Sequence, residues 1–309
     1  MNSAPTEEPD FSYQAASPDL APILHAVEHE RWAEVSDLLA EVRGAYEVSY
    51  VSKLSNTAGM YKYICGLGEK ATALQLAMRA KFETMLAWEA RSTQRAEHVN
   101  EWQWRAFRDG LVKSERLLLR LIADDPGNAL AWEARIVNSR GLELGHSETR
   151  RRYERLAAIA PHQRNAQMYT LVQFVPKWGG SWEAAHNFAR ECAQASPPGS
   201  LNAELIAGYY SEHWIDTQDT NLLRGKDVAE ELMAAAQHSV LHKDFGRPYG
   251  WVPALSCFAF LFCLAGDYAA AAPFFRALGD LGSRRAWSLL PGDPARNFVK
   301  YRDRALAKG

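Results

Sequence analysis

Two Glu-x-x-His strings are the arrangement in this sequence with the clearest capacity to bind a metal. They run from Glu143 to His146 and from Glu183 to His186. On a helix this spacing places a carboxylate and an imidazole on one face, and di-iron and di-manganese bundles use two such strings with two further glutamates. Gly145, however, falls where a turn is expected, and Glu183 falls in a first helical turn, where the helix dipole favours a carboxylate without any metal. The sequence therefore predicts polar helix ends, with a metal site at Glu183 and His186 as the alternative.

A further pair of histidines has the spacing of a helical zinc site. His25 and His29 are four residues apart, with Glu28 between them and Glu30 beside them. The order differs from the H-E-x-x-H string of zinc proteases, in which the glutamate is the general base. The sequence favours a polar hairpin edge here, and it predicts no cofactor for the chain.

Other patterns that carry chemistry are missing from the sequence. No G-x-S-x-G string is present, so a hydrolase nucleophile is not indicated. Gly66 and Gly68 lack the preceding strand and the third glycine of a phosphate-binding loop. The run from Arg150 to Arg152 is typical of a solvated helix face, with contact to an anionic partner as the alternative.

Composition argues against several classes of partner. The chain has 309 residues and a formal net charge of -2, so no overall field attracts nucleic acid or an anionic membrane. No window approaches the ~18 uninterrupted apolar residues of a membrane span. Residues 1–17 lack the apolar core of a signal peptide and are expected to form a disordered leader. The cysteines form no C-x-x-C pair, so they predict buried reduced thiols and a cytoplasmic location: Cys65, Cys192, Cys257 and Cys263.

Helices are the elements that must position these side chains. Apolar residues recur at i, i+3 and i+4, while period-2 runs of Val, Ile and Thr are scarce, so the sequence predicts an all-α fold. A first hairpin is expected over 20–42, with its second helix beginning at Trp32. Further helices are expected over 46–65, over 69–107, where no Gly or Pro interrupts the chain, and over 294–307.

A repeat is visible in the middle of the chain. Three helical segments end before prolines at positions 126, 161 and 197, at intervals of 35 and 36 residues, and each proline is followed within a few residues by Asn-Ala. Before the third proline, Pro176, Gly179 and Gly180 form a corner, Ser181 is placed to cap a helix, and Trp182 opens that helix on its packing face. This period with a closing proline resembles tetratricopeptide repeats, in which each helical hairpin buries its apolar face against the next.

The resemblance implies a fold for residues 18–309. That fold is a right-handed α-α superhelix of stacked antiparallel hairpins, an α-solenoid, in one domain, with its clearest repeats over 111–200 and 262–282. Second helices of hairpins are expected to begin near 32, 111, 146, 182 and 268, with weaker matches near 69 and 226. The sequence departs from the family in its longer intervals, with insertions expected at 217–224 and 243–253. The Trp-Gly-Gly-Ser string also resembles an uncharacterised bacterial family of helical-repeat proteins.

The same resemblance implies a function in binding. Proteins of this family hold a protein or peptide in a groove lined by the first helix of each repeat, so the chain is expected to be a non-catalytic adaptor or regulatory subunit. Ala134 and Thr170 stand where carboxylate-gripping family members have lysine, so a different polar contact is expected. The candidate groove residues are Arg135, Asn138, Lys177, Trp178, Tyr209, Tyr210, Trp214 and Trp251. Because Tyr209 and Tyr210 are adjacent, at least one of them is expected to meet solvent or a ligand.

Two other classes of function stay open at this point. One is a helical-scaffold enzyme of a biosynthetic pathway that uses a His/Glu site. The other is a sensor whose aromatic groove takes a small molecule. A closed pocket with converging Glu and His side chains favours the enzyme, whereas an open groove favours partner binding.

Overall fold

The computed structural model describes residues 8–41, 54, 57–94 and 96–309. Over these residues the chain is helical without any β-strand, and an isolated parallel bridge joins Asp10 to Leu281. The all-α prediction is confirmed. No helix within the same ranges combines the length and the apolar character that crossing a membrane requires. Most of the predicted helix over 46–65 lies outside the described residues, which include α5 (Ala58–Leu67).

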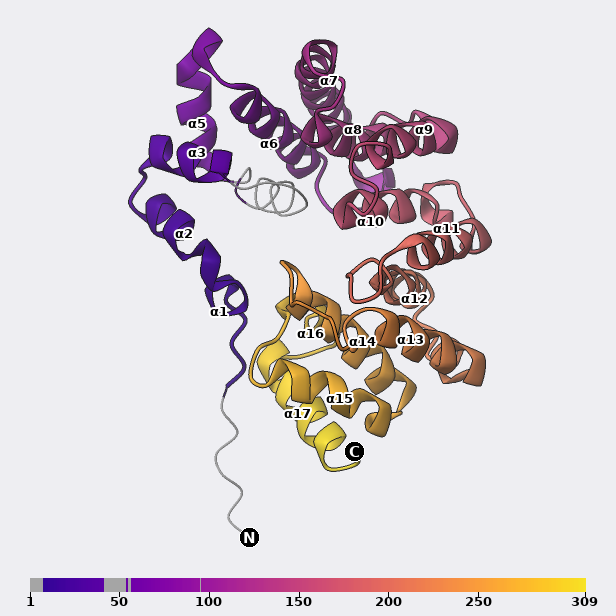
Figure 1. Ribbon diagram of the computed structural model, residues 1–309. Coiled ribbons are helices and arrows are strands. Elements are labelled where there is room, and N and C mark those ends of the chain that lie inside the picture. The colour runs from indigo at the N-terminus through magenta and orange to yellow at the C-terminus, as the bar shows by residue number, and fades with distance from the viewer. Residues whose placement is uncertain (1–7, 42–53, 55–56, 95) are drawn as a thin grey trace. The chain divides into compact units, whose positions relative to one another are not determined.

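The helices belong to two compact units (Figure 1). Unit 2 is Ala21–Phe174, and unit 1 combines the N-terminal residues up to Leu20 with Val175–Gly309. Unit 1 is therefore assembled from two separate stretches of the chain. The proposed single repeat domain over 18–309 stays a prediction.

Unit 2 is built from helices that pack in sequence order. They are α2 (Ala21–Glu28), α3 (Trp32–Glu41), α5, α6 (Ala73–Arg91), α7 (Glu101–Asp124), α8 (Ala129–Gly141), α9 (Gly145–Ala157) and α10 (Arg164–Gln173). From α5 onward each helix contacts the next one, and α8 also contacts α6 and α10 (Figure 1).

The break between α6 and α7 corrects the predicted helix over 69–107. The chain leaves α6 at Ser92, which has a φ of 67°, and α7 begins after Asn100. Asn100 and Gln103 form a capping box, in which each side chain accepts a hydrogen bond from the other residue's backbone N–H. The positive φ of Ser92 ends α6 and a side-chain capping box starts α7, both without Gly or Pro, which is why the sequence prediction of one continuous helix is wrong.

A second correction concerns the helix start predicted near 111. Helix α7 runs unbroken from Glu101 to Asp124, so no hairpin corner lies at Gly110. A Cβ atom on Gly110 would lie 2.9 Å from the Cβ atom of Ala87 in α6. The glycine allows two long helices to approach closely, and it does not mark a turn.

Unit 1 holds the remaining helices and two prominent loops. The helices are α1 (Tyr13–Ala16), α11 (Trp182–Ala195), α12 (Glu204–Thr217), α13 (Lys226–His238), α14 (Trp251–Ala265), α15 (Tyr268–Leu278), α16 (Arg284–Trp287) and α17 (Pro294–Leu306). Helices begin as predicted near 182, 226, 268 and 294. The loops follow α12 and α13, where insertions were expected.

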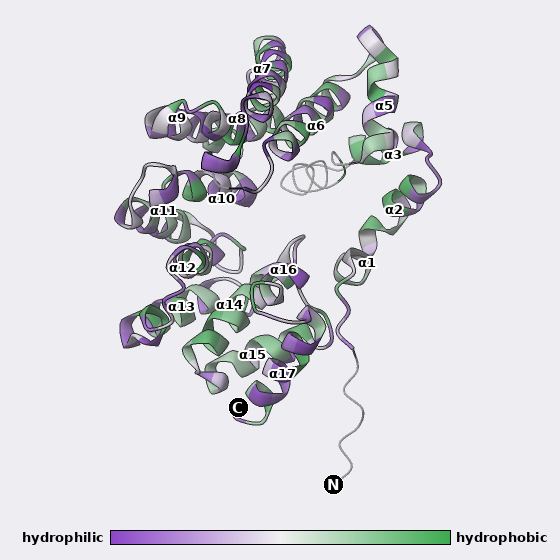
Figure 2. Cartoon of the chain, turned by 180° about the vertical axis from the view of Figure 1, so that it is seen from behind, coloured by the Kyte–Doolittle hydropathy of each residue, from purple (hydrophilic) through white to green (hydrophobic). Residues whose placement is uncertain are grey.

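The core of unit 1 is aromatic. Trp287 is fully buried, and its ring centroid lies 5.6 Å from that of Phe260 and 5.7 Å from that of Phe298. Helices α14 and α15 are rich in apolar residues, as their green colour shows (Figure 2), and Phe260 and Phe275 of these helices lie next to Trp287. Burial of these rings removes a large apolar area from water and so stabilises the unit.

The N-terminal residues 8–17 dock on this core. The backbone N–H of Asp10 donates to the Asp280 carbonyl at 2.8 Å, and the N–H of Gly282 donates to the Asp10 carbonyl at 3.0 Å. Phe11 packs edge-on against Phe298 with ring centroids 6.2 Å apart. Residues 8–17 are thus part of unit 1 and not a free leader, because Phe11 finds an apolar partner in α17.

Candidate functional site

A hollow of about 190 Å³ lies between α6, α8 and α10 of unit 2. We call it the α6/α8/α10 hollow. Its lining residues are Lys81, Thr84, Met85, Trp88, Ala134, Val137 and Tyr169. The four residues from α6 are spaced i, i+3, i+4 and i+7, so they share one face of that helix. The walls combine an apolar surface with the ammonium group of Lys81 and the phenol of Tyr169.

A buried ion pair stands at the edge of this hollow. Lys81 Nζ contacts the carboxylate of Glu133, whose side chain is 0% exposed. A carboxylate buried without a cation would carry a large desolvation penalty, so Glu133 holds Lys81 in place. The pair therefore fixes the orientation of Lys81, the one cationic side chain among the described residues that line the hollow.

Hydrogen bonds behind the hollow lock its helices together. Asn138 Nδ2 donates to Ser114 Oγ at 3.0 Å, and Thr84 Oγ1 donates to Asn138 Oδ1 at 2.8 Å. Arg135 Nε donates to Glu115 Oε1 at 2.8 Å. These bonds join α8 to α6 and α7. Arg135 and Asn138, both predicted to meet a partner, are buried, and here they hold the walls of the hollow.

The conspicuous corner before α11 lies in unit 1. Pro176 to Trp178 form one turn of 3-10 helix, and Gly179 follows with a φ of 86°. Ser181 Oγ accepts the backbone N–H of Ala184 at 3.0 Å, so the predicted cap is confirmed. Lys177 Nζ lies 2.8 Å from Glu212 Oε2 in α12, which engages its charge within the unit.

The densest polar contacts of unit 1 converge on Glu231 in α13. Arg190 Nε donates to this carboxylate at 2.6 Å, the Tyr210 hydroxyl donates at 2.5 Å, and His186 Nε2 lies 2.9 Å away. With Tyr209, which stacks on His186 at 4.2 Å between ring centroids, these residues form the Glu231 cluster. Three helices are joined at one carboxylate.

The protonation equilibria of the cluster follow from this arrangement. Burial lowers the pKa of His186, against the attraction of Glu231. Burial alone would raise the pKa of Glu231, but the hydrogen bonds from Arg190 and Tyr210 and the proximity of His186 together lower it. Burial and the bond to Glu231 raise the pKa of Tyr210. The resting state is an ionised Glu231 surrounded by donors from a neutral imidazole, a neutral phenol and a guanidinium group.

A second hollow, of about 280 Å³, lies beside this cluster. Alanines and Ile206 form the apolar part of its lining, and Arg190, Gln194, Glu231 and His238 contribute its polar side chains. His238 Nε2 lies 3.0 Å from the Ser196 carbonyl, so its ring is already engaged. Because Glu231 accepts three donors from the protein, little of its capacity is left for a ligand.

The other aromatic candidates fill the interior of unit 1. Trp214 packs edge-on against Phe260 at 5.4 Å between ring centroids, and Trp251 Nε1 donates to the Ala16 carbonyl at 2.9 Å. Both are buried, as are Tyr209 and Tyr210, so neither tyrosine meets solvent. Trp178 is half-buried in the corner. A role for these residues in binding a partner stays a prediction.

The Glu-x-x-His strings do not bring their members together. His186 turns to Glu231, 45 residues away, while Glu183 is exposed in the first turn of α11. His146 packs edge-on against Phe174, with ring centroids 5.8 Å apart. No sequence pattern predicts the role of Glu231, because its hydrogen bonds to α11 and α12 depend on how the three helices pack.

Comparison with known proteins assigns no role to these residues. No family model matches the chain, and no curated protein matches its sequence. The function proposed below therefore depends on the geometry of the two units.

Proposed function

We propose that this chain is a non-catalytic binding protein that takes a protein or peptide segment in the α6/α8/α10 hollow. The observation that carries the proposal is that three alternate helices of unit 2 line one hollow. Alternate helices line the concave face of stacked helical hairpins, which is the binding surface of such proteins.

The packing order in unit 2 supports a tetratricopeptide-like stack as the underlying architecture. In such a stack each helix packs on its successor, and the first helices of neighbouring hairpins also touch. Helices α6 to α10 have these contacts, with α6, α8 and α10 as first helices and α7 and α9 as second helices. The right-handed superhelix is part of the proposal.

The size of the hollow favours a side chain of a longer segment over a whole small molecule. Sites for drug-sized ligands measure roughly 300–1,000 Å³, whereas this hollow measures about 190 Å³. Met85, Trp88 and Val137 offer an apolar surface to one anchoring side chain. Lys81 lies at the same hollow, and its ammonium group has three hydrogens, so it can donate to a carbonyl oxygen of the segment's backbone as well as to Glu133.

The Glu231 cluster gives weaker support to the rival enzyme. Its His and Glu side chains converge, as a catalytic site requires, but Glu231 already accepts hydrogen bonds from three neighbours. A general base needs a lone pair directed at its substrate. The cluster is better explained as a clamp between α11, α12 and α13.

A cytoplasmic location belongs to the same proposal. All four cysteines are free thiols, and Cys192 and Cys263 are buried. Burial raises the pKa of the Cys263 thiol to about 12, so this group is not reactive at neutral pH. Free thiols of this kind fit a reducing compartment.

Selection of peptides from a random displayed library against the full chain tests the proposal. Enriched peptides should share one apolar anchor residue. Their affinity, measured by fluorescence anisotropy, should fall at least about tenfold for Val137→Glu, because a charge would be buried in the apolar wall.

Leu119→Glu is the matched control, since Leu119 is an exposed aliphatic residue of α7 that does not line the hollow. It should leave affinity unchanged. Equal binding by the wild type and Val137→Glu would overturn the proposal, as would a library that yields no peptide while a metabolite screen raises the melting temperature.

A further inference from the structure

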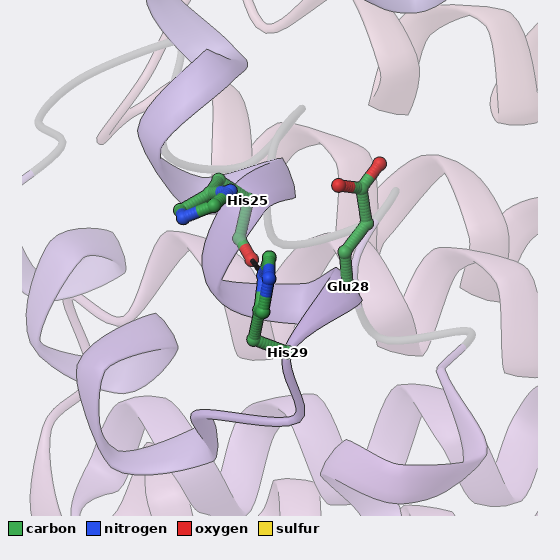
Figure 3. A group of neighbouring side chains, drawn as sticks. All are labelled: His25, Glu28 and His29. Atoms are coloured by element: carbon green, nitrogen blue, oxygen red, sulfur yellow. Dashed lines mark hydrogen bonds between the residues drawn. The ribbon is translucent and has the colours of Figure 1, made fainter.

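Three side chains with metal-binding atoms gather where α2 ends. Figure 3 shows His25 and Glu28 on the last turn of the helix and His29 directly after it. All three side chains are exposed, and one ligand atom from each lies within 4.8 Å of the other two. Among the residues that the structure describes, no other group of three such side chains meets this condition.

The helix itself creates this grouping. Residues at i, i+3 and i+4 share one face, and the turn continues past Glu28 because the N–H of His29 donates to the His25 carbonyl at 3.3 Å. The imidazole rings of His25 and His29 lie with their centroids 4.2 Å apart and their planes tilted by 55°. Their proximity therefore follows from local sequence alone and needs no tertiary contact.

One hydrogen bond prepares His29 for coordination. Its Nδ1 lies 2.8 Å from the His25 carbonyl oxygen (Figure 3). A carbonyl oxygen can only accept, so Nδ1 carries the hydrogen and the neutral ring has its lone pair on Nε2. Histidines that bind metals commonly donate their other ring N–H in this way, which fixes both tautomer and ring orientation.

The local electrostatics favour a cation. The carboxyl end of a helix carries a partial negative charge, and Glu28 and Glu30 add full negative charges beside it. The nearby cation Arg31 is engaged with Glu34 at 2.9 Å. A positive ion at His25 and His29 would thus lie at the negative end of α2.

We propose that His25, Glu28 and His29 bind a divalent ion of the zinc class. Two imidazoles and a carboxylate suit Zn²⁺, Ni²⁺ or Cu²⁺, whereas Mg²⁺ and Ca²⁺ prefer sites made of oxygen ligands only. Tetrahedral zinc with bonds of about 2.0–2.1 Å places its nitrogen ligands roughly 3.3 Å apart. The ligand atoms now lie within 4.8 Å of one another, so small side-chain rotations, which exposed residues permit, would bring them to that distance. Three protein ligands leave one coordination position for water or for a group from another molecule.

Titration of the full chain, free of any histidine tag, with ZnCl₂ in a calorimeter tests this site. One ion should bind per chain, and Mg²⁺ should not compete. His25→Ala and His29→Ala should each weaken binding at least about tenfold, because removing one of three ligands leaves only two. Glu28→Gln should weaken it less than either histidine variant, since the amide oxygen remains a weak ligand.

His98→Ala is the matched control. His98 is another exposed histidine of unit 2 with a glutamate, Glu97, beside it, and its removal should leave zinc affinity unchanged. The proposal fails if the wild type binds no zinc at 0.1 mM, a concentration of the order expected to saturate an exposed three-ligand site. It also fails if the His25→Ala, His29→Ala double variant binds zinc as the wild type does.

Discussion

At the scale of single residues, Glu231 shows how one buried carboxylate can join three helices. Its donors come from α11 and α12, and the carboxylate comes from α13. Hydrogen bonds to an ionised group are stronger than those between neutral groups. Removing the charge should therefore loosen the contact between helices more than it alters any one helix.

Acidification should weaken this part of unit 1. The pKa of His186 is lower in the folded protein than in the unfolded chain. The stability that the neutral imidazole contributes is therefore fully present when the pH is above the pKa of the unfolded state, and it is lost as the pH falls through the pKa of the folded state. The pKa of Glu231 is also lowered, so the same sign applies at lower pH. After correction for the pH dependence of intrinsic amide exchange, the amides of α11 to α13 should exchange faster at about pH 4 than at neutral pH.

The variant Glu231→Gln tests the role of the charge, because it removes the negative charge of the carboxylate and keeps the shape of the side chain. At neutral pH it should reduce the protection of α11 to α13 by roughly 1–3 kcal/mol, and the loss of protection on acidification should be smaller than in the wild type. Glu183→Gln, at an exposed carboxylate of α11, should behave as the wild type does. Equal acid sensitivity of the wild type and Glu231→Gln would contradict this role.

The sequence could identify His186 but not what it does. The Glu-x-x-His string suggests that His186 pairs with Glu183, three residues away, whereas in the folded chain it contacts Glu231, 45 residues away. Local spacing predicts contacts within a helix, as at His25 and His29, because the helix geometry is fixed. It does not predict contacts that depend on how three helices pack.

At the scale of elements, glycine in α7 has a packing role. Gly110 faces Ala87 of α6 at a distance that leaves no room for a side chain. Ala87 also belongs to a buried cluster with Phe107 and Leu111, so it has no space into which to move. Close approach of the two helices allows this cluster to form.

Gly110→Ala should therefore destabilise unit 2. Alanine normally stabilises a helix relative to glycine by up to about 1 kcal/mol, but overpacking against Ala87 should cost roughly 1–3 kcal/mol and reverse the sign. Gly66→Ala in α5 is the control, since among the described residues no atom outside its own helical turn and chain neighbours lies within 4 Å of the added methyl group, so alanine should stabilise there. Urea unfolding measures both, and a Gly110→Ala protein more stable than the wild type would refute the argument.

The helix boundaries show what the sequence could predict. The start at Trp182 was predicted from a corner followed by the capping residue Ser181, and the start at Tyr268 was predicted from the frame of the repeat. The start of α7 was missed although Asn100 and Gln103 have capping-box spacing, because no Gly or Pro drew attention to them. Gly110 misled the prediction because glycine serves turns and close helix contacts equally.

At the scale of the whole molecule, unit 1 is built from residues that precede unit 2 in the sequence and residues that follow it. The segment that contains Asp10, Phe11 and Ala16 contributes backbone hydrogen bonds and an aromatic contact to helices that follow Val175. Composition indicated a disordered leader because the segment is short and polar. The contacts that dock it are the Phe11 ring, two backbone hydrogen bonds at Asp10 and the hydrogen bond from Trp251 to the Ala16 carbonyl, and none of these leaves a pattern in the sequence.

Removal of residues 1–17 should destabilise unit 1 further than removal of residues 1–7 alone. The longer deletion loses the Phe11 contact with Phe298 and the carbonyl that accepts Trp251 Nε1. A loss of roughly 1–3 kcal/mol is expected, similar to truncating a partly buried aromatic side chain. Hydrogen exchange in α14 and α17 measures it, with Phe11→Ala giving a partial effect. Identical protection in both truncated proteins would show that the segment contributes nothing.

The divided composition of unit 1 also has a consequence for synthesis on the ribosome. Residues 8–17 leave the ribosome before any of unit 2, but their docking partners, Asp280, Gly282 and Phe298, are translated after all of unit 2. Unit 2 can complete its contacts while translation continues, because its residues are contiguous. Phe11 stays exposed to water until α17 emerges, so a segment that is translated before unit 2 reaches its final place only after all of unit 2 has been translated.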